Sequence, residues 1–234
     1  MTIERRPFES LGRFQLDWLN ARHHFSFGGY FDPQRMGVGP LRVWNDDQIR
    51  PSSGFDPHPH RDMEIITYVR TGAISHMDHL GNEGRTVAGD VQVMSAGTGI
   101  VHAEYNLEDD LTEIFQIWIQ PKGRGGAPCW ETRAFPKDTW AGGLTALASG
   151  QDGISGALPI DQDATLYAAS LAAGQTIEHG LGKDRQGYLV PASGRLRLAG
   201  VELAARDGAV IRDEPGLVLE ALEESEVLLA DLPR

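Results

Sequence analysis

Residues 54–72 read GFDPHPHRDMEIITYVRTG, and this stretch indicates both the fold and the chemistry of the chain. Its second half is rich in β-branched and aromatic side chains and ends at a glycine, which is typical of a β-strand. Its first half sets His58 and His60 two residues apart, each directly after a proline. Pro57 and Pro59 fix φ and remove backbone hydrogen-bond donors, so this strand is expected at a sheet edge or a barrel mouth.

The rest of the chain has the same strand character. Short segments rich in β-branched or aromatic residues are bounded by Gly, Pro, Asp or Asn, as in sandwiches and barrels. The 28 glycines and 13 prolines among 234 residues follow no fixed period and indicate many turns. The sequence therefore predicts an all-β fold. The expected strands, besides the one at 63–69, cover residues 89–95, 113–120, 194–203, 216–222 and 225–232.

The composition shifts toward Gly, Pro and Trp over residues 124–143, where we expect a connection between two domains. A weak internal repeat supports this division, because YVRTGAIS and VAGDVQVMS resemble VPASGRLRL and AARDGAVIR. The alignment pairs Gly72 with Gly194 and Asp90 with Asp207. We predict two antiparallel β-barrels in one chain. Their expected bounds are 1–130 for a first domain with a metal site, 131–143 for a linker and 144–234 for a second domain without one.

Charge and composition exclude several classes of function. The chain has 33 acidic and 21 basic side chains, and its formal charge of −12 would repel a phosphate backbone, so we expect no direct nucleic-acid binding. No apolar run approaches the ~20 residues that span a bilayer, and the first residues lack the apolar core of a secretory signal. The single cysteine, Cys129, is read as a linker residue and permits no internal disulfide. We expect a soluble, cytoplasmic, monomeric protein.

Two pairs of polar residues predict a metal site. Side chains at i and i+2 of a strand point to the same face, so His58 and His60 project together. The segment GTGIVHAEYN adds His102 and Glu104 with the same spacing. Three imidazoles and one carboxylate on one ion suit Fe(II), Mn(II), Ni(II), Cu(II) or Zn(II), and they leave up to two of six octahedral positions open.

Plainer interpretations exist for these residues. The histidine pair fits a proline-rich turn, and Glu104 fits a solvated strand. However, the apolar, Gly-rich tract before His102 favours a buried Glu104, where an unpaired carboxylate is costly and a metal removes that cost. Glu64 is a rival ligand because its parity matches His58 and His60, but a straight strand would carry it roughly 13 Å beyond His60. We therefore expect Glu64 to be a supporting or structural acid.

The remaining histidines are weaker candidates. The polar turn SHMDHLGNEG, which holds His76, Asp78 and His79, is typical of a solvated hairpin. His23 and His24 lie among aromatic residues and either close a pocket or pack on it, and His179 is isolated. Carrying the four ligands across the repeat leads to positions without metal-binding side chains, so the second barrel is predicted to lack a metal. These positions are Gly180, Gly182, Leu219 and Ala221.

Residues 54–72, followed by GDVQVMSAGTGIVHAEYN, resemble the pirin family of the cupin superfamily, and most closely the bacterial pirin-like quercetin 2,3-dioxygenases. The stretches ARHHFSFGGYFDP, LRVWNDDQI, FQIWIQP and SEVLLADLP match the family as well. The general cupin motifs are matched only in part, because Ser95 replaces a usual proline and the tract before His102 is longer. The resemblance implies a bicupin of jelly-roll barrels. It also implies that His58, His60, His102 and Glu104 bind the metal and that Glu64 does not.

The resemblance further implies a dioxygenase that cleaves flavonols such as quercetin with O2 and releases carbon monoxide. A carboxylate that is loosely held on the metal is a natural base for the flavonol hydroxyl, and we expect Glu104 to take this role. Fe(II) is the expected ion, and Mn, Ni, Co, Cu and Zn are alternatives. Two other functions compete with this one. The protein could be a regulatory metalloprotein that binds a protein partner, or a cupin enzyme for another enolisable substrate. The aromatic candidates for a pocket wall, which core packing explains equally well, are Phe25, Phe27, Phe31 and Trp44.

Overall fold

Strands form almost every element of the computed structural model, which describes residues 2–135, 143–214 and 216–234. Among these residues the helical element is a single 3-10 turn, η1 (Phe8–Ser10). The all-β prediction is confirmed. No helix in the described part of the chain is long and apolar enough to cross a membrane.

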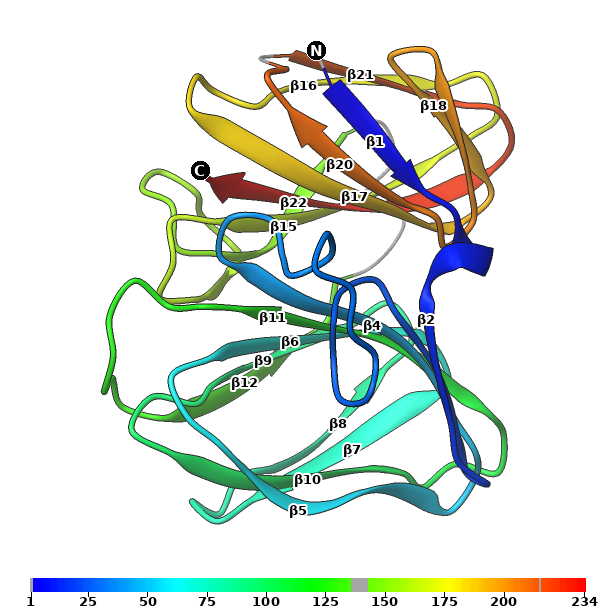
Figure 1. Cartoon of the computed structure of the whole chain (residues 1–234). Helices are drawn as coiled ribbons and strands as arrows, with labels where there is room; N and C mark the ends of the chain where they lie inside the picture. The colour runs from blue at the N-terminus through cyan, green and yellow to red at the C-terminus, as the bar shows by residue number, and fades with distance from the viewer. Residues whose placement is uncertain (1, 136–142, 215) are drawn as a thin grey trace.

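The first half of the chain forms a seven-stranded sheet in the order β12-β9-β6-β11-β4-β3-β2, which faces a four-stranded sheet in the order β5-β10-β7-β8 (Figure 1). Every strand pair in these two sheets is antiparallel. The strands are β2 (Gly12–Gln15), β3 (Leu19–His23), β4 (Leu41–Ile49), β5 (Ser53–His60), β6 (Glu64–Thr71), β7 (Ala73–Asp78), β8 (Glu83–Val87), β9 (Val91–Ser95), β10 (Ile100–Asn106), β11 (Thr112–Ile119) and β12 (Cys129–Arg133).

The second half repeats this plan, with a seven-stranded sheet β1-β20-β17-β22-β15-β13-β14 and a four-stranded sheet β16-β21-β18-β19. Its strands are antiparallel apart from the short pair β13–β14. The two-barrel prediction is therefore confirmed. The strands are β1 (Thr2–Arg6), β13 (Thr145–Ser149), β14 (Leu158–Pro159), β15 (Thr165–Leu171), β16 (Thr176–Gly180), β17 (Arg185–Ser193), β18 (Arg195–Leu198), β19 (Val201–Ala204), β20 (Gly208–Arg212), β21 (Gly216–Ala221) and β22 (Ser225–Pro233).

The internal repeat corresponds to equivalent turns in the two halves. Gly72 joins β6 to β7 at φ 75°, and Gly194 joins β17 to β18 at φ 74°, a backbone conformation that favours glycine. The segment 194–203, expected as one strand, is a hairpin of β18 and β19, because Ala199 and Gly200 both adopt positive φ. The predicted alignment of Gly72 with Gly194 is thus confirmed by the turn that each residue makes.

The two halves exchange an edge strand. β1, at the start of the chain, pairs with β20 of the second half, whereas β12 holds the equivalent place beside β9 in the first half. Asp207 accepts a hydrogen bond from the backbone N–H of Phe8 at 2.8 Å, and Asp90 accepts one from Phe135 at 3.4 Å. These aspartates, which the repeat pairs, each hold the chain directly after an exchanged strand.

The predicted connection at 124–143 therefore contains a strand, β12, because its backbone completes the edge of the first large sheet. Residues 136–142 of this connection lie outside the described residues. The domain bounds 1–130, 131–143 and 144–234 remain a proposal.

The two seven-stranded sheets pack against each other, with the largest cluster of buried apolar side chains between them (Figure 1). Trp44 and Phe115 contribute from the first half, and Tyr188 and Leu228 from the second. His24 lies in this interface with its Nδ1 2.8 Å from the Tyr188 hydroxyl, and its buried Nε2 has no hydrogen-bond partner. The interface thus holds a buried imidazole.

His24 is expected to make the protein acid-sensitive. Burial, followed by the charge of Arg6, lowers the pKa of His24 to about 3. Because the unfolded chain takes up this proton near pH 6.5 and the folded chain does not, the free energy of unfolding falls as pH drops. A His24→Gln variant should lose about 3 kcal/mol less stability between pH 7 and pH 4 than the wild type, as measured by urea unfolding. An exposed-site control, His79→Gln, should lose as much as the wild type, and an equal loss in His24→Gln would contradict the assignment.

Candidate metal centre

The predicted ligands come together through the irregular pairing of β5 with β10. His58 pairs with His102 and Phe55 with Glu104, so the β5 segment between His58 and Phe55 is one residue longer than its β10 counterpart. This bulge turns Phe55 to the same face as the histidines. The ring centroids of His58 and His102 lie 4.5 Å apart, and those of His60 and His102 lie 5.0 Å apart. As predicted from its prolines, β5 is an edge strand.

The three histidines have nitrogens suited to a metal ion. Their ligand atoms lie within 4.8 Å of one another. His58 Nδ1 lies 2.7 Å from the Asp56 carbonyl oxygen and donates to it, which leaves the Nε2 lone pair for an ion. His102 Nε2 is buried without a hydrogen-bond partner. Burial lowers the pKa of His60 to about 4 and that of His102 to about 2, with neighbouring histidines adding to both effects, so these rings are neutral.

Glu104 lies close to His102, on the same strand. It belongs to a second group of donors, with His76 and His102, whose ligand atoms also lie within 4.8 Å of one another. Gln92 and Gln116 donate to its carboxylate at 2.5 and 2.8 Å. Burial raises the pKa of Glu104 to about 7 although its hydrogen bonds favour the anion. Neutral imidazoles and a buried carboxylate fit a divalent cation, because the cation offsets the cost of burying the charge.

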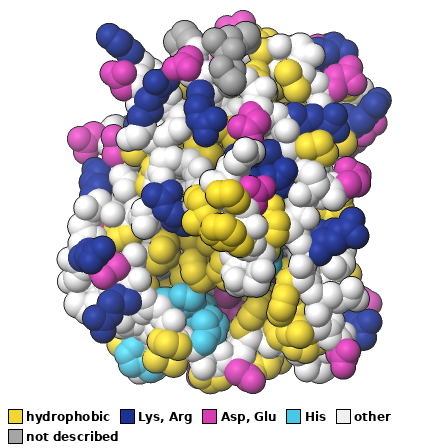
Figure 2. Space-filling model, viewed as in Figure 1, with side chains coloured by type: hydrophobic (Ala, Val, Ile, Leu, Met, Phe, Trp, Pro, Cys, Tyr) yellow, Lys and Arg dark blue, Asp and Glu magenta, His cyan; other side chains and the backbone are white. Residues whose placement is uncertain are grey.

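A cavity of about 260 Å³ opens beside His58 and His60. Figure 2 shows histidine side chains next to hydrophobic side chains on the lower part of this face. The aromatic part of the wall consists of Phe14, His23, Phe27, Phe55 and Trp118, and the polar part includes Asn45, Asp47 and Gln116. The arrangement suits a flat, aromatic ligand with a few polar groups.

The aromatic candidates from the sequence separate in the structure. Phe27 lines the cavity, whereas Phe25 and Trp44 pack in the core between the large sheets. Phe31 is 72% exposed. Phe14 and Trp118 were missed because their strands meet at the cavity only through long-range pairing. Phe55 was missed because its parity differs from that of His58 and His60, and only the bulge brings it to their face. Asp47, also missed, has a pKa well above its usual value because of burial and the nearby charges of Asp46 and Glu104.

Glu64 lies apart from the histidine cluster. It is buried on β6, in the sheet opposite β5, and the Ser95 hydroxyl donates to its carboxylate at 2.5 Å. Among the described residues, neither donor group includes it. His23 lines the cavity, while His24 packs between Trp44 of the first half and Tyr188 of the second. His179 lies 3.8 Å from Asp231 in the second half.

The prediction of a solvated hairpin is wrong for His76 and Asp78, whose side chains are both 0% exposed. The reason is that β7 lies between β10 and β8, and His76 pairs with Glu104, so its side chain faces the barrel interior. Of the three residues His76, Asp78 and His79, only His79 is exposed. The polar composition of this turn therefore did not indicate that His76 and Asp78 are buried.

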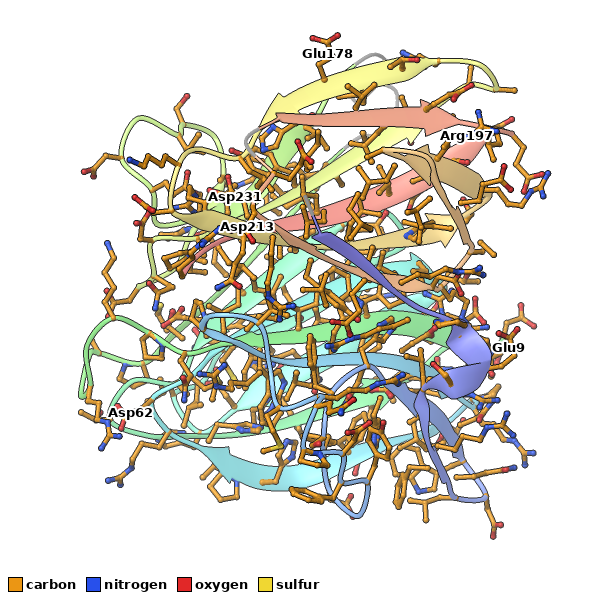
Figure 3. All side chains as sticks on the ribbon, turned by 45° about the horizontal axis from the view of Figure 1, so that its top comes forward. Glu9, Asp62, Glu178, Arg197, Asp213 and Asp231 are labelled. Carbon is orange, nitrogen blue, oxygen red and sulfur yellow. The ribbon has the colours of Figure 1, made fainter. Side chains whose placement is uncertain are left out.

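The second barrel has no such cluster among its described residues. Its interior is apolar, and Leu219 and Ala221, which the repeat aligns with His102 and Glu104, belong to that core. On β16, Glu178 points away from the molecule, as Figure 3 shows. The absence of a metal from the second barrel stays a prediction.

Comparison with known proteins identifies the family. The Pirin family matches residues 4–119, and the quercetinase C-terminal cupin domain matches residues 146–232. A pirin-like protein of Caulobacter vibrioides is 59% identical over 229 residues, covering 98% of this chain and 99% of that protein. The chain belongs to the pirin family. Its two barrels are therefore cupin domains, as the resemblance implied.

Two further matches come from Escherichia coli. A protein named quercetin 2,3-dioxygenase, from strain K12, is 41% identical over 232 residues, covering 99% of both chains. The crystal structure of a bacterial pirin in complex with nickel(II) has a TM-score of 0.94 and 39% identity, and the match covers 99% of both chains. The pirin fold thus extends over nearly the whole chain.

Proposed function

We propose that this pirin-family protein is a metal-dependent dioxygenase that cleaves flavonols such as quercetin with O2 and releases carbon monoxide. The observation that carries the proposal is the cluster of His58, His60 and His102 beside an aromatic-walled cavity, with a buried carboxylate next to it. The relative named quercetin 2,3-dioxygenase supports the same activity.

The proposed metal ligands are His58, His60, His102 and Glu104, with Fe(II) as the proposed ion. The relative solved with nickel(II) supports a divalent transition metal in this family. When bound, such an ion withdraws electron density from the chelating 3-hydroxy-4-keto edge of a flavonol and holds it near dioxygen. The protein's own contribution is to position the flavonol and to move its proton.

The cavity walls orient the substrate. Trp118 contacts the His60 ring with centroids 4.9 Å apart, and Phe27 contacts Trp118 at 5.3 Å, so the aromatic wall continues directly from the ligands. A flat flavonol ring stacking on this wall would direct its hydroxy-keto edge toward the histidines. Such positioning brings the reacting groups together in a productive orientation.

Glu104 is the proposed base. In the metal-free protein, burial raises the pKa of Glu104 to about 7, which makes its carboxylate a stronger base than an exposed one. The proton of the flavonol 3-hydroxyl moves to Glu104 and returns to the product carboxylate. Overall, the C2–C3 and C3–C4 bonds break and C3 leaves as carbon monoxide. The two atoms of O2 bond to C2 and C4 of the depside product, so O2 is reduced by electrons from the flavonol carbons.

The function is tested by carbon monoxide release. The protein is stripped of metal, reloaded without oxygen with Fe(II), Mn(II), Ni(II), Co(II), Cu(II) or Zn(II), and mixed with quercetin before O2 is admitted. We expect one carbon monoxide per O2 consumed with at least one redox-capable ion, and none in metal-free protein. Absence of carbon monoxide with every ion would contradict the proposal. The expected monomeric state and any protein partner remain predictions.

Removing an aromatic wall should weaken substrate binding. The Phe27→Ala variant is expected to raise the KM for quercetin about tenfold, since stacking and burial of one aromatic contact contribute roughly 1–2 kcal/mol. The matched control is Phe31→Ala in the same loop, because Phe31 is largely exposed and does not line the cavity. Steady-state kinetics with metal-loaded protein measure both variants. Equal KM values for the two variants would show that Phe27 does not contact the substrate.

A further inference from the structure

His102 is connected to a second buried histidine and to a carboxylate. His76 Nδ1 lies 3.4 Å from His102 Nδ1, on the side of the His102 ring away from its unpartnered Nε2. His76 Nε2 in turn lies 3.1 Å from Asp78 Oδ2. The side chains of His76 and Asp78 are both 0% exposed, so water does not compete for these contacts. The three residues form a linear chain of hydrogen bonds from β7 to β10.

The carboxylate determines the direction of these hydrogen bonds. Asp78 accepts from the backbone N–H groups of Leu80 and Asn82 through Oδ1 and from the Asn82 amide through Oδ2, so it is an acceptor toward His76 as well. His76 therefore carries its proton on Nε2 and offers the lone pair of Nδ1. His102 then donates its Nδ1–H to that lone pair, which leaves the His102 Nε2 lone pair free.

The orientation of His76 is fixed from a third side. The Trp130 indole stacks on the His76 ring with centroids 4.7 Å apart and planes 7° from parallel. Trp130 Nε1 donates to Gln92 Oε1 at 3.3 Å, and the Gln92 amide donates to Glu104 at 2.5 Å. Strand β12 thereby supports both the His102 and the Glu104 sides of the cluster. The pair is held in one orientation by packing as well as by hydrogen bonds.

We propose that Asp78 and His76 are positioning residues that set the tautomer of His102 and thereby present its Nε2 lone pair to a divalent metal ion. The inference rests on the metal site of the proposed function, but the tautomer itself is a property of the metal-free protein. The chain of hydrogen bonds replaces the usual single acceptor behind a metal-binding histidine with a second histidine and a carboxylate.

A single isosteric substitution at Asp78 should reverse the direction of the hydrogen bonds that link Asp78, His76 and His102. In Asp78→Asn, the backbone donors of Leu80 and Asn82 retain the side-chain oxygen, so the amide nitrogen faces His76. The Asn82 side-chain amide, which donates to this position in the wild type, turns to present its oxygen instead. The amide then donates to His76 Nε2, His76 carries its proton on Nδ1, and His102 Nδ1 becomes the acceptor. The His102 proton moves to Nε2, where it blocks the metal.

Two measurements test the proposal. Nitrogen-15 NMR of the imidazoles in metal-free protein should show His102 protonated at Nδ1 in the wild type and at Nε2 in Asp78→Asn. Competition with a chelator for Ni(II) should show metal affinity about 10–100-fold weaker in Asp78→Asn, and a smaller loss in Asp78→Ala, which removes the acceptor without supplying a donor. His79→Ala in the same hairpin is the control and should match the wild type in both measurements.

A second variant, His76→Phe, tests the same hydrogen bonds independently of how well Asp78→Asn folds. His76→Phe keeps a ring against Trp130 but removes the acceptor for His102 Nδ1–H, and it should also weaken Ni(II) binding. The inference is overturned if His102 remains protonated at Nδ1 in Asp78→Asn, or if both variants bind Ni(II) as the wild type does. Failure of the wild type to bind any metal would instead refute the proposed function, while the NMR result would still decide the tautomer.

Discussion

The His58→Ala, His60→Ala double variant is expected to lose metal binding and carbon monoxide release together. The two imidazoles supply two of the three nitrogens that cluster beside the cavity, and one histidine with one carboxylate does not hold a transition metal in a defined geometry. Without the ion, the rate of quercetin cleavage should fall at least about 10³-fold, which corresponds to roughly 4 kcal/mol of lost transition-state stabilisation. Metal content by elemental analysis and carbon monoxide release measure the two effects.

The fold should survive this double change. His58 and His60 are only half-buried, and their strand is an edge strand bonded to β10 alone, so the apolar clusters of the first barrel are untouched. Circular dichroism and thermal unfolding of the metal-free protein should therefore match the wild type. The control is His179→Ala in the second half, which should keep both metal and activity. Retention of one equivalent of metal by the double variant would show that the ion binds elsewhere.

Several strands could be predicted from local sequence, whereas their partners could not. The alternation and turn residues identified β6, β9, β11, β21 and β22, and the prolines correctly placed β5 at an edge. The exchange of β1 into the second sheet could not be predicted, because Thr2–Arg6 and Gly208–Arg212 are far apart in the chain and neither shows a pattern that specifies the other. Pairing over such distances depends on the whole core.

The same distinction applies to the site. The i, i+2 spacing was sufficient to predict that His58 and His60 share a face, and that His102 and Glu104 do, because strand parity is a local property. The meeting of the two pairs depends on the pairing of β5 with β10, which no local pattern specifies. His76 was misjudged because its neighbours are polar, and its burial results from the strands on either side of β7. Phe14 reaches the cavity from a strand at the far edge of the other sheet, so no local pattern relates it to the histidines.

A Glu104→Gln variant should separate the two roles of this carboxylate. As the proposed base, Glu104 accepts the flavonol proton, and an amide does not. We expect kcat for quercetin to fall on the order of 10²–10⁴-fold, with weaker metal binding because one anionic ligand is lost. The control is Glu64→Gln, which changes a buried carboxylate on the opposite sheet and should keep metal and turnover. Kinetics at saturating metal distinguish lost proton transfer from lost metal.

The stability of metal-free protein supplies an independent check on the same residue. Burial holds the pKa of Glu104 at about 7 in the folded chain, above its ordinary value of 4.5. Its contribution to stability is therefore complete below pH 4.5 and is lost as pH rises through 7, because the unfolded chain releases the proton first. Between pH 5 and pH 8 this group should account for a loss of about 2–3 kcal/mol in the wild type that is missing in Glu104→Gln. Saturating metal should remove the difference in the wild type, since the ion stabilises the anion. Parallel pH profiles of the two metal-free proteins would mean that burial does not raise the pKa of Glu104, and the support that this raised pKa gives to the proposed base would be lost.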